Sequence, residues 1–592
     1  MKRLLTGNEG AARGAYEAGV VYASAYPGTP STEILEELGQ YKGEMMAEWA
    51  PNEKTALESA IGACYAGARA MSAMKMVGLN VAADPFFGVA YTGVNGGLVI
   101  VSADDPGLHS SQNEQDNRHY AQSAKMPMME PSNSQEAKDM MKAAFEISET
   151  FDTPVLFRMT TRVCHSKSIV ELGERHEVAI KPYSRNINKY DLVPAVSKKL
   201  HYVVENRLKN LAAFSNQTSW NYIEWNDKKI GIISSGVAFQ YAREVFGKTA
   251  SYFKIGFSYP LPLDSIRDFA NQVETLYVIE ELDPFMEMQI KAAGIACIGK
   301  EKIPNIDELN PDIIAEALLG QKPALIEYDK SIVANRPPTL CAGCPHRGFF
   351  YELGKLKNVF ISGDIGCYAL GGTPPLNAKD LSICMGASIT VGHGAQKIFS
   401  RYDKPLRSIA TIGDSTFFHS GITGLLQVVY NQSNTITCIL DNRITGMTGH
   451  QENPGSGYTL QGDMTTIADI EAIVRAIGVK HVRTINPLQL DEVRAALQWA
   501  QSIDGPVVII TRWPCVLKKH SLQDKKEFGD YMGTCVVRKE SCIGCRKCTM
   551  TGCPALIYQK QDKKVQIDQV QCDGCQVCAQ VCPVQAIERV EG

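Results

Sequence analysis

The cysteines near the carboxyl end of the sequence fall into two runs whose spacing suits iron–sulfur chemistry. Each run has three cysteines at two-residue gaps and a fourth cysteine that precedes a proline. The first run is Cys542, Cys545, Cys548 and Cys553, and the second is Cys572, Cys575, Cys578 and Cys582. Such a run ligates a [4Fe–4S] cluster in bacterial-type proteins, and in paired runs the fourth cysteine ligates the other cluster.

We therefore predict two [4Fe–4S] clusters with crossed ligands. One cluster takes Cys542, Cys545, Cys548 and Cys582, and the other takes Cys572, Cys575, Cys578 and Cys553. A structural zinc ribbon or a disulfide knot is the alternative, but neither fits two triple-cysteine runs that each close with Cys-Pro. The first run has four residues before its last cysteine where three are usual, which lengthens one loop and removes no ligand. The tail is thus expected to export electrons that are produced elsewhere in the chain.

A second group of residues suits a cation and a phosphate. Two strand-like runs, 407–412 and 435–440, are followed closely by Asp414 and Asn442. Parallel α/β sheets bind ligands at the carboxyl ends of their strands, so both side chains are expected at one sheet edge. Carboxylate and amide oxygens suit Mg²⁺, with diphosphate oxygens completing its octahedron. The alternative is a pair of ordinary polar turns; the small residues of 385–394, which would let a backbone approach phosphate, are weak support.

These residues need α/β domains to position them. Strand-like and helical patterns alternate along the chain, which predicts several parallel-sheet α/β domains followed by the cluster-binding tail. The predicted divisions are 1–182, 183–335, 336–530 and 531–592. Strands are expected at 97–102, 229–234, 276–280 and 507–511, and a helix at 52–69. Residues 183–225 are expected to form a polar crossover or linker, and 322–338, with three prolines, a boundary.

Composition narrows the function classes. A formal net charge of −4 over 592 residues gives no reason to expect nucleic acid as a partner. No stretch approaches about 18 uninterrupted apolar residues and no apolar segment follows the first residues, so neither a membrane span nor a signal peptide is expected. Cluster ligands must stay reduced, so the sequence predicts a cytoplasmic protein.

Motifs at the amino-terminal end carry a family resemblance. Tyr26-Pro-Gly28-Thr29-Pro resembles the Tyr-Pro-Ile-Thr-Pro motif of 2-oxoacid:ferredoxin oxidoreductases, with Gly28 in place of Ile. The segment 53–68 resembles their pyrimidine-binding helix, and the Gly-Asp-x to Asn spacing resembles their diphosphate–magnesium motif. Over essentially its whole length the chain is similar to the α subunits of the indolepyruvate-type members. This resemblance implies transketolase-like thiamine domains, a domain that resembles the transketolase C-terminal domain, and a ferredoxin domain with two clusters.

The resemblance implies thiamine diphosphate and Mg²⁺ as cofactors. It makes Asp414, Asn442 and the backbone carbonyl of Ile444 the metal ligands, with Gly413 and Ser415 completing the motif. Ser415 stands where the family often has glycine, and we do not expect this difference to abolish binding.

The resemblance also implies catalytic residues. Glu53 matches the glutamate that hydrogen-bonds to the pyrimidine ring, a role that requires a buried carboxyl group. Glu48 and Glu58 are the competing choices, and a solvated glutamate at a helix start is the alternative. Thr29 and His346 are further catalytic candidates, although a lone histidine is as readily structural.

A third cluster is implied by four further cysteines. They are Cys341, Cys344, Cys367 and Cys515. A Cys-x-x-Cys pair alone could be redox-active, zinc-binding or part of the core, but the four together resemble the proximal [4Fe–4S] ligands of pyruvate:ferredoxin oxidoreductases. The other cysteines are expected to be small buried residues, namely Cys64, Cys164, Cys297, Cys384, Cys438 and Cys535. Four polar residues at strand ends could face a substrate carboxylate, namely His109, Arg158, Arg162 and His165.

By this resemblance the chain is the catalytic α subunit of an enzyme that oxidatively decarboxylates arylpyruvates with coenzyme A. The products would be arylacetyl-CoA and CO2, and electrons would pass through the clusters to ferredoxin. A smaller β subunit is implied as partner, in an α2β2 assembly. The alternatives are a different 2-oxoacid as substrate, non-oxidative thiamine chemistry, and a non-catalytic electron-transfer subunit. Exported electrons argue against the second alternative, and the thiamine motifs argue against the third.

Overall fold

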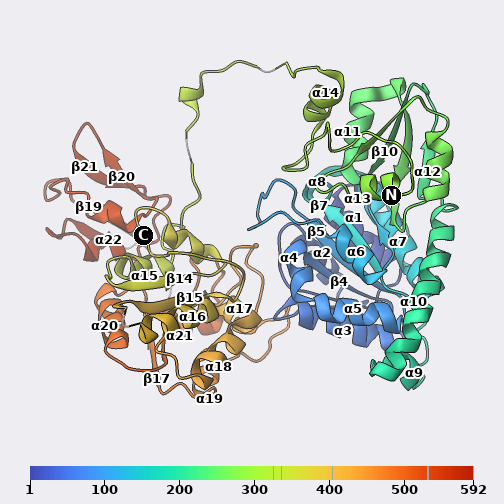
Figure 1. Ribbon diagram of the computed structural model, residues 1–592. Coiled ribbons are helices and arrows are strands. Elements are labelled where there is room, and N and C mark those ends of the chain that lie inside the picture. Colours follow the sequence, from blue (N-terminus) through green and yellow to red (C-terminus); the bar gives the residue numbers. More distant parts are fainter. Residues whose placement is uncertain (325, 335, 403, 530–532, 591–592) are drawn as a thin grey trace. The chain divides into compact units, whose positions relative to one another are not determined.

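The structure is a computed structural model that describes residues 1–592 apart from 325, 335, 403, 530–532 and 591–592. The chain forms two units, Met1–Tyr328 and Asp329–Gly592 (Figure 1). The division falls inside 322–338, the segment expected to form a boundary. Within the described part of the chain, no helix has both the length and the apolar character needed to cross a membrane.

The first unit is built around a seven-stranded sheet with the order β12-β6-β7-β5-β4-β2-β3. Its strands are β2 (Tyr22–Ala25), β3 (Met46–Trp49), β4 (Ala70–Lys75), β5 (Leu98–Asp104), β6 (Met128–Met129), β7 (Val155–Thr160) and β12 (Phe257–Tyr259). All neighbours are parallel except β12 and β6. The strand predicted at 97–102 is β5, and every residue of it is buried, as expected of a central strand covered on both faces.

Helices link these strands, because parallel neighbours need crossover connections. They are α1 (Gly7–Glu17), α2 (Thr32–Gly39), α3 (Glu53–Tyr65), α4 (Met76–Val81), α5 (Ala83–Thr92), α6 (Arg118–Ala124), α7 (Ser134–Phe151) and α8 (Thr161–His165). A separate antiparallel pair joins β1 (Lys2–Thr6) to β8 (Lys167–Glu171). The helix predicted at 52–69 is α3. It begins at Glu53 because the Asn52 side chain accepts a hydrogen bond from the Thr55 N–H at 2.8 Å.

A four-stranded sheet with the order β13-β10-β11-β9 completes the first unit. Its strands are β9 (Asn221–Glu224), β10 (Ile230–Ser235), β11 (Ser251–Ile255) and β13 (Thr275–Ile279). The helices around it are α11 (Gly236–Phe246), α12 (Leu263–Ala270), α13 (Phe285–Ala292) and α14 (Pro311–Leu319), with a 3-10 turn, η1 (Gly247–Thr249). The strands predicted at 229–234 and 276–280 are therefore confirmed as β10 and β13.

The segment 183–225, expected to form a polar crossover or linker, is an ordered crossover and not an unstructured linker. That segment holds α9 (Ile187–Tyr190), the 22-residue helix α10 (Pro194–Ser215) and β9. The buried residues of α10 are Leu200, Val204, Arg207, Leu211 and Ser215. Their spacings of four, three, four and four place them on one side of the helix, while the other sides carry polar and charged residues together with apolar ones such as Tyr202, Val203 and Leu208. The buried stripe is narrow and includes an arginine and a serine, so the segment appears polar in sequence.

The second unit contains a five-stranded sheet with the order β14-β15-β16-β18-β17 and only parallel neighbours. Its strands are β14 (Val359–Ser362), β15 (Arg407–Gly413), β16 (Ile436–Asp441), β17 (His481–Ile485) and β18 (Val507–Arg512). Its helices are α15 (His346–Leu353), α16 (Ser388–Arg401), α17 (Asp414–Thr416), α18 (Ile422–Tyr430), α19 (Ile470–Ala476), α20 (Leu490–Gln501) and α21 (Leu522–Phe528). Shorter turns are η2 (Lys330–Ile332), η3 (Cys367–Gly372) and η4 (Phe417–Gly421). The strands predicted at 407–412, 435–440 and 507–511 are confirmed.

The cysteine-rich tail also belongs to the second unit. It has two antiparallel pairs, β19 (Thr534–Val537) with β22 (Ile587–Val590) and β20 (Leu556–Gln559) with β21 (Lys564–Ile567). Two short helical turns complete it, η5 (Cys548–Thr551) and α22 (Val577–Gln580). Its core consists of Cys535, Cys548, Val565, Ile567 and Ile587. A core this small normally depends on metal or disulfide cross-links for stability.

Candidate functional site

Asp414 and Asn442 lie at the same sheet edge in the second unit, as the sequence predicts. β15 and β16 are adjacent parallel strands, so their carboxyl ends point the same way. Gly413 ends β15 and Asp414 begins α17, while Asn442 directly follows β16. The Asp414 side chain is buried and accepts a hydrogen bond from Asn453 Nδ2 at 3.3 Å. The fold therefore delivers a carboxylate and an amide to one buried point.

Three oxygen-bearing groups converge at this point. One end of the Asn442 side-chain amide lies 2.7 Å from the carbonyl oxygen of Ile444 and 3.2 Å from Oδ1 of Asp414. If this end is the NH2 group, it donates to both oxygens. If it is the oxygen, three acceptors face one another, and only a cation between them makes that arrangement stable. Oxygens at right angles around Mg²⁺, each about 2.1 Å from the ion, lie about 3.0 Å apart. The three groups thus fit a magnesium site.

The electrostatics of Asp414 also favour a cation. Burial, followed by the charge of Asp441, raises the pKa of Asp414 to about 7. Asp441 itself is held by Arg512 at 2.7 Å. A divalent cation at Asp414 would offset both the burial and the repulsion, and would keep the carboxylate ionised.

Gly413 and Ser415 shape the chain around Asp414. A Cβ atom on Gly413 would lie 2.5 Å from the ring of Tyr368, so no larger residue fits there without a shift of that ring. The Tyr368 hydroxyl donates to the Ile365 carbonyl at 2.7 Å, which fixes the ring. Ser415 Oγ accepts a hydrogen bond from Thr445 Oγ1 at 2.9 Å. Its side chain therefore joins the turn that carries Ile444.

The small residues of segment 385–394 suggested a phosphate-binding backbone, but two of its N–H groups bind a side chain of the protein itself. The backbone N–H groups of Gly386 and Ser388 donate to Asp364, at 2.7 and 2.9 Å. Asp364 is buried, and burial raises the pKa of its carboxyl group. Sequence reasoning missed this residue, which takes two of the N–H groups that could otherwise meet a phosphate.

His346 lies beside the converging oxygens. It begins α15, is 3% exposed, and its Nε2 lies 3.4 Å from Nδ2 of Asn442. Its ring meets that of Tyr368 edge-on, with centroids 6.0 Å apart. Burial lowers the pKa of His346 to about 4. The imidazole is therefore neutral near pH 7.

The four cysteines of the predicted third cluster come together next to this site. They are Cys341, Cys344, Cys367 and Cys515. Burial raises the pKa of Cys344 to about 12 and that of Cys367 to about 11, and in both cases Cys515 and Cys341 raise it further. A Cβ atom on Gly446 would lie 3.7 Å from Cys367 Sγ and 3.8 Å from Asn442 Nδ2. The thiols therefore adjoin the candidate magnesium ligands.

The tail brings the first crossed cysteine set together. A cavity is lined by Cys542, Cys545, Cys548 and Cys582. Burial raises the pKa of Cys548 to about 11, and the charges of the other three thiols raise it further. The thiols converge from both runs, which is the arrangement that crossed ligation of a cluster requires.

The second crossed set is gathered in the same way. Burial raises the pKa of Cys575 to about 12, with further contributions from Cys553, Cys535 and Cys572. The Cys535 thiol contacts both Cys572 and Cys578: the contact with Cys572 lowers its pKa, and the contact with Cys578 together with burial raises it, to about 11. The longer loop before Cys553 is accommodated at Gly552, whose φ of 70° suits glycine.

Outside the ligand sets, most cysteines are buried as expected. Those with buried positions are Cys64, Cys164, Cys438 and Cys535, and Cys297 is half-buried. The expectation is wrong for Cys384, which is exposed, because it precedes α16 in a surface segment. Cys535 has an additional contact, since its backbone N–H donates to Cys572 Sγ at 3.2 Å.

In the first unit, Glu53 differs from its two competitors by its burial. Glu53 is 5% exposed, whereas Glu48 and Glu58 are exposed and interact with Tyr22 and Lys54 respectively. A Cβ atom on Gly78 would lie 2.6–2.9 Å from Glu53 side-chain atoms, so the glycine permits the close packing of α4 on this carboxylate.

Thr29 follows β2 and is half-buried. Its carbonyl oxygen accepts a hydrogen bond from Ser110 Oγ at 3.2 Å. The same serine accepts a hydrogen bond from Lys75, a buried lysine at the end of β4. Sequence reasoning missed Lys75, which ends a strand made mostly of small and apolar residues.

The four polar residues considered for a substrate carboxylate are already engaged. Arg158 is buried and pairs with Asp104 at 2.8 Å and with Glu130 at 2.5 Å, so the expectation is wrong for this residue. Arg162 and His109 both pair with Glu308. His165 lies 3.8 Å from Glu33, and the hydrogen bond to that carboxylate raises the pKa of His165.

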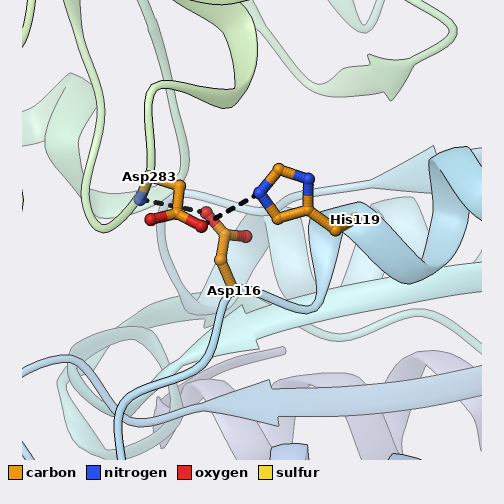
Figure 2. Close-up of side chains that lie close together, drawn as sticks. All are labelled: Asp116, His119 and Asp283. Carbon is orange, nitrogen blue, oxygen red and sulfur yellow. Dashed lines mark hydrogen bonds and ion pairs between the residues drawn. The ribbon is translucent and has the colours of Figure 1, made fainter.

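A further cluster of acidic residues and histidine lies in the first unit. Asp116, His119 and Asp283 offer ligand atoms within 4.8 Å of one another (Figure 2). The guanidinium of Arg118 donates to Asp116 at 2.5–3.0 Å and to Glu280 at 2.6 Å, so a cation already occupies the place beside these carboxylates. Asp116 therefore belongs to a buried ion pair with Arg118, His119 and Asp283 form a more exposed pair, and we assign no metal to this cluster.

Comparison with known proteins places these features in a family. Residues 13–208 match a model described as pyruvate flavodoxin/ferredoxin oxidoreductase, thiamine diP-bdg, and residues 364–511 match thiamine pyrophosphate enzyme, C-terminal TPP binding domain. Residues 565–588 match a 4Fe-4S binding domain.

Curated relatives cover nearly the whole chain. The protein from Archaeoglobus fulgidus named indolepyruvate oxidoreductase subunit IorA is 40% identical, over 99% of this chain and 97% of its own length. Proteins of the same name from Pyrococcus horikoshii and Methanothermobacter marburgensis are 38% and 39% identical, over 100% and 99% of this chain and 97% of their own lengths.

Proposed function

The chain belongs to the family of indolepyruvate oxidoreductase subunits IorA, and from this membership we propose that it oxidatively decarboxylates arylpyruvates with coenzyme A. It is a thiamine-dependent 2-oxoacid:ferredoxin oxidoreductase subunit with a 4Fe–4S domain. The proposed products are arylacetyl-CoA and CO2, with two electrons passed to ferredoxin. Support for an aromatic substrate comes from the names of the relatives.

One observation carries the proposal. The oxygens of Asp414 and Ile444 converge with the Asn442 amide, and the four-thiol group lies directly beside them. A diphosphate–magnesium site next to a one-electron acceptor is the combination that oxidative thiamine chemistry requires. Non-oxidative thiamine chemistry has no need of the adjacent thiols. An electron-transfer subunit without catalysis has no need of the oxygens.

The proposed roles of the residues follow from their environments. Asp414, Asn442 and Ile444 would hold Mg²⁺ and, through it, the diphosphate. When bound, thiamine diphosphate supplies stabilisation of the negative charge that forms as CO2 leaves. Glu53, buried against Gly78, would hold the pyrimidine ring and keep water from it.

His346 is proposed to act as a neutral group. Because burial lowers the pKa of His346 to about 4, it can accept a proton or donate a neutral N–H beside Asn442, but it does not carry a charge at pH 7. Thr29 is proposed to contact the substrate, since its motif lies at the end of β2 in the pyrimidine-type domain.

The contacts of Gly343 support a particular order of electron transfer. Gly343 lies between Cys341 and Cys344, and a Cβ atom on it would lie 2.8 Å from Asp573, which adjoins Cys572. Burial raises the pKa of Cys553, and a hydrogen bond from the Gly343 backbone lowers it. The tail cluster on Cys553, Cys572, Cys575 and Cys578 would therefore receive electrons from the proximal cluster. The cluster on Cys542, Cys545, Cys548 and Cys582, whose Cys545 is exposed, would deliver them to ferredoxin.

Partners and location are part of the same proposal. The family implies a smaller β subunit, and we propose an α2β2 assembly in the cytoplasm, because thiolate ligands require a reducing compartment. Ferredoxin, coenzyme A and the 2-oxoacid are the remaining partners.

An anaerobic assay tests the function. The chain, purified with its smaller subunit, is given a panel of 2-oxoacids together with coenzyme A and a viologen dye. We expect arylpyruvates to reduce the dye fastest, and only when coenzyme A is present. A preparation without stoichiometric thiamine diphosphate, or dye reduction that needs no 2-oxoacid, would contradict the proposal.

A further inference from the structure

Arg347 is a buried cation that contacts the ligand loops of two predicted clusters. It is 2% exposed, and its guanidinium donates to three backbone carbonyl oxygens. Those of Leu340 and Cys341, the latter at 2.7 Å, belong to the loop of the proximal cluster. The third, that of Thr551 at 2.9 Å, belongs to the loop that ends at Cys553. One side chain thus joins the proximal loop to a loop of the inner tail cluster, the one predicted on Cys553, Cys572, Cys575 and Cys578.

No carboxylate in the described part of the chain pairs with this guanidinium. Its hydrogen bonds all go to neutral carbonyl groups, and among the same residues its buried Nε has no acceptor. Asp573, which approaches the proximal loop at Gly343, forms neither an ion pair nor a hydrogen bond with Arg347 there. A charge removed from water normally requires a partner of opposite charge. The described residues do not supply that partner.

The other buried arginines each face a carboxylate. The ion pairs are Arg118 with Asp116, Arg158 with Asp104, and Arg443 with Glu527. Arg207 donates to backbone carbonyls, as Arg347 does, but a carboxylate acts on it: burial lowers the pKa of Arg207, and the charge of Asp152 raises it. Among the described buried arginines, Arg347 is therefore the one whose counter-charge must come from outside the polypeptide.

The position of Arg347 in its helix adds to the positive charge. It is the second residue of α15, whose first turn contains no acidic residue. The N-terminal end of a helix carries a partial positive charge and favours anions, so a cation there is the reverse of the usual arrangement. The helix end and the guanidinium both favour an anion at this point.

The charge of Arg347 acts on one thiol from each cluster. Burial raises the pKa of Cys344 to about 12, and the charge of Arg347 lowers it. Burial also raises the pKa of Cys553, and the charge of Arg347 lowers it. The guanidinium therefore favours the thiolate form, which is the form that binds a metal. A cluster held by four thiolates is anionic, and each electron that it accepts adds one negative charge.

We infer that Arg347 is a shared counter-cation of the proximal cluster and the inner tail cluster, an inference that rests on the proposed function. Its charge stabilises the reduced state of both clusters and so raises both reduction potentials. When one electron leaves the proximal cluster and reduces the inner tail cluster, the added negative charge stays beside the same guanidinium. Arg347 is thus a positioning residue for electron transfer, and it acts through the clusters.

The reduction potentials of the clusters test the inference. The holoenzyme with its partner subunit is titrated anaerobically with dithionite and followed by EPR, and Cys515→Ser and Cys575→Ser assign the signals. We expect Arg347→Gln to shift the reduction equilibria of the proximal and inner tail clusters toward the oxidised form by about tenfold or more, which is about 59 mV for one electron. Arg347→Lys keeps the charge and should keep both potentials near the wild-type values. The cluster on Cys542, Cys545, Cys548 and Cys582 should shift less in both variants.

A control variant separates the charge from the loss of a buried side chain. Arg207→Gln removes a buried arginine from the first unit, which holds none of the predicted cluster ligands, and should leave all three potentials unchanged. If Arg347→Gln assembles its clusters poorly, iron analysis decides: iron loss in Arg347→Gln but not in Arg347→Lys supports the charge role, and equal loss in both overturns it.

Three results of the titration would overturn the inference. They are unchanged potentials in Arg347→Gln, an equal shift of all three clusters, and a shift in Arg347→Lys as large as that in Arg347→Gln. A wild type in which only two clusters titrate would instead contradict the proposed path of the electrons, and the inference would fail with it.

Discussion

The backbone N–H of Cys515 donates to the carbonyl oxygen of Asn442 at 3.0 Å. A predicted cluster ligand and a predicted magnesium ligand are therefore joined by one hydrogen bond. The contact arises because β16 and β18 are neighbouring parallel strands whose carboxyl ends lie together. Electron acceptor and cofactor site are thus built from adjacent strands of one sheet.

The first prediction concerns iron content. The anaerobically prepared protein should contain about twelve iron atoms per chain, as expected for three [4Fe–4S] clusters. Cys515→Ser should lower this to about eight, because only the proximal cluster loses a ligand. Cys384→Ser, at an exposed cysteine outside the ligand sets, should keep the wild-type content. Iron and acid-labile sulfide analyses measure both; a wild-type value near eight would remove the third cluster from the account.

Loss of the Asp414 carboxylate should weaken the Mg²⁺-dependent binding of thiamine diphosphate. Asp414→Asn removes the anionic ligand, and we expect thiamine diphosphate affinity in the presence of Mg²⁺ to fall by about 100-fold or more, since outer ligand partners alone typically contribute 10–100-fold. Chelation of Mg²⁺ should release the cofactor from the wild type. The exposed Asp463→Asn serves as control. Calorimetry that finds wild-type affinity in Asp414→Asn would place the cofactor elsewhere.

Glu53 should matter for turnover while Glu58 should not. Glu53→Gln keeps the volume but removes the carboxyl group that is proposed to hydrogen-bond to the pyrimidine ring, so turnover should fall by about 100-fold or more, the size of effect expected when a group that assists proton transfer is lost. Glu58→Gln, on the exposed side of the same helix, should retain wild-type turnover. Steady-state rates with the partner subunit compare the two. Ordinary turnover by Glu53→Gln would exclude Glu53 from catalysis.

His346 should make stability sensitive to acid. Its pKa is about 4 in the folded chain and about 6.5 when exposed. Below pH 6.5 the unfolded chain binds a proton that the folded chain does not, so stability is present above that pH and is lost as the pH falls. Between pH 7.5 and 5.5 the loss from this group is about 1 kcal/mol. Denaturant unfolding should show a smaller loss in His346→Gln; equal losses in both proteins would show that His346 is not buried in its neutral form.

The order in which the two tail clusters receive electrons can be determined by measuring their reduction by substrate. Cys575→Ser disables the cluster next to Gly343, so substrate should no longer reduce the cluster on Cys542, Cys545, Cys548 and Cys582. Cys545→Ser should leave substrate reduction of the inner cluster intact and slow transfer to ferredoxin. Freeze-quench EPR distinguishes the two signals. Rapid reduction of the outer cluster in Cys575→Ser would reverse the order.

Some features were accessible from sequence because their residues are local. Cysteine spacing predicts the two ligand sets of the tail, the family resemblance implies the third, and the strands before Asp414 and Asn442 are largely apolar runs. Asp104 and Glu130, the partners of Arg158, are brought to it by tertiary packing, so no local sequence pattern predicts these ion pairs. The buried stripe of α10 is diluted by polar residues. Lys75 could not be recognised from the sequence, because only tertiary packing brings its ammonium group to Ser110.

The stoichiometry of a single reaction tests the central claim most directly. The holoenzyme with its partner subunit, ferredoxin, coenzyme A and an arylpyruvate should form one arylacetyl-CoA and one CO2 for every two electrons recovered in reduced ferredoxin. Mass spectrometry, labelled CO2 and the ferredoxin spectrum measure the three products. Release of CO2 with an aldehyde product and no reduced ferredoxin would contradict the account.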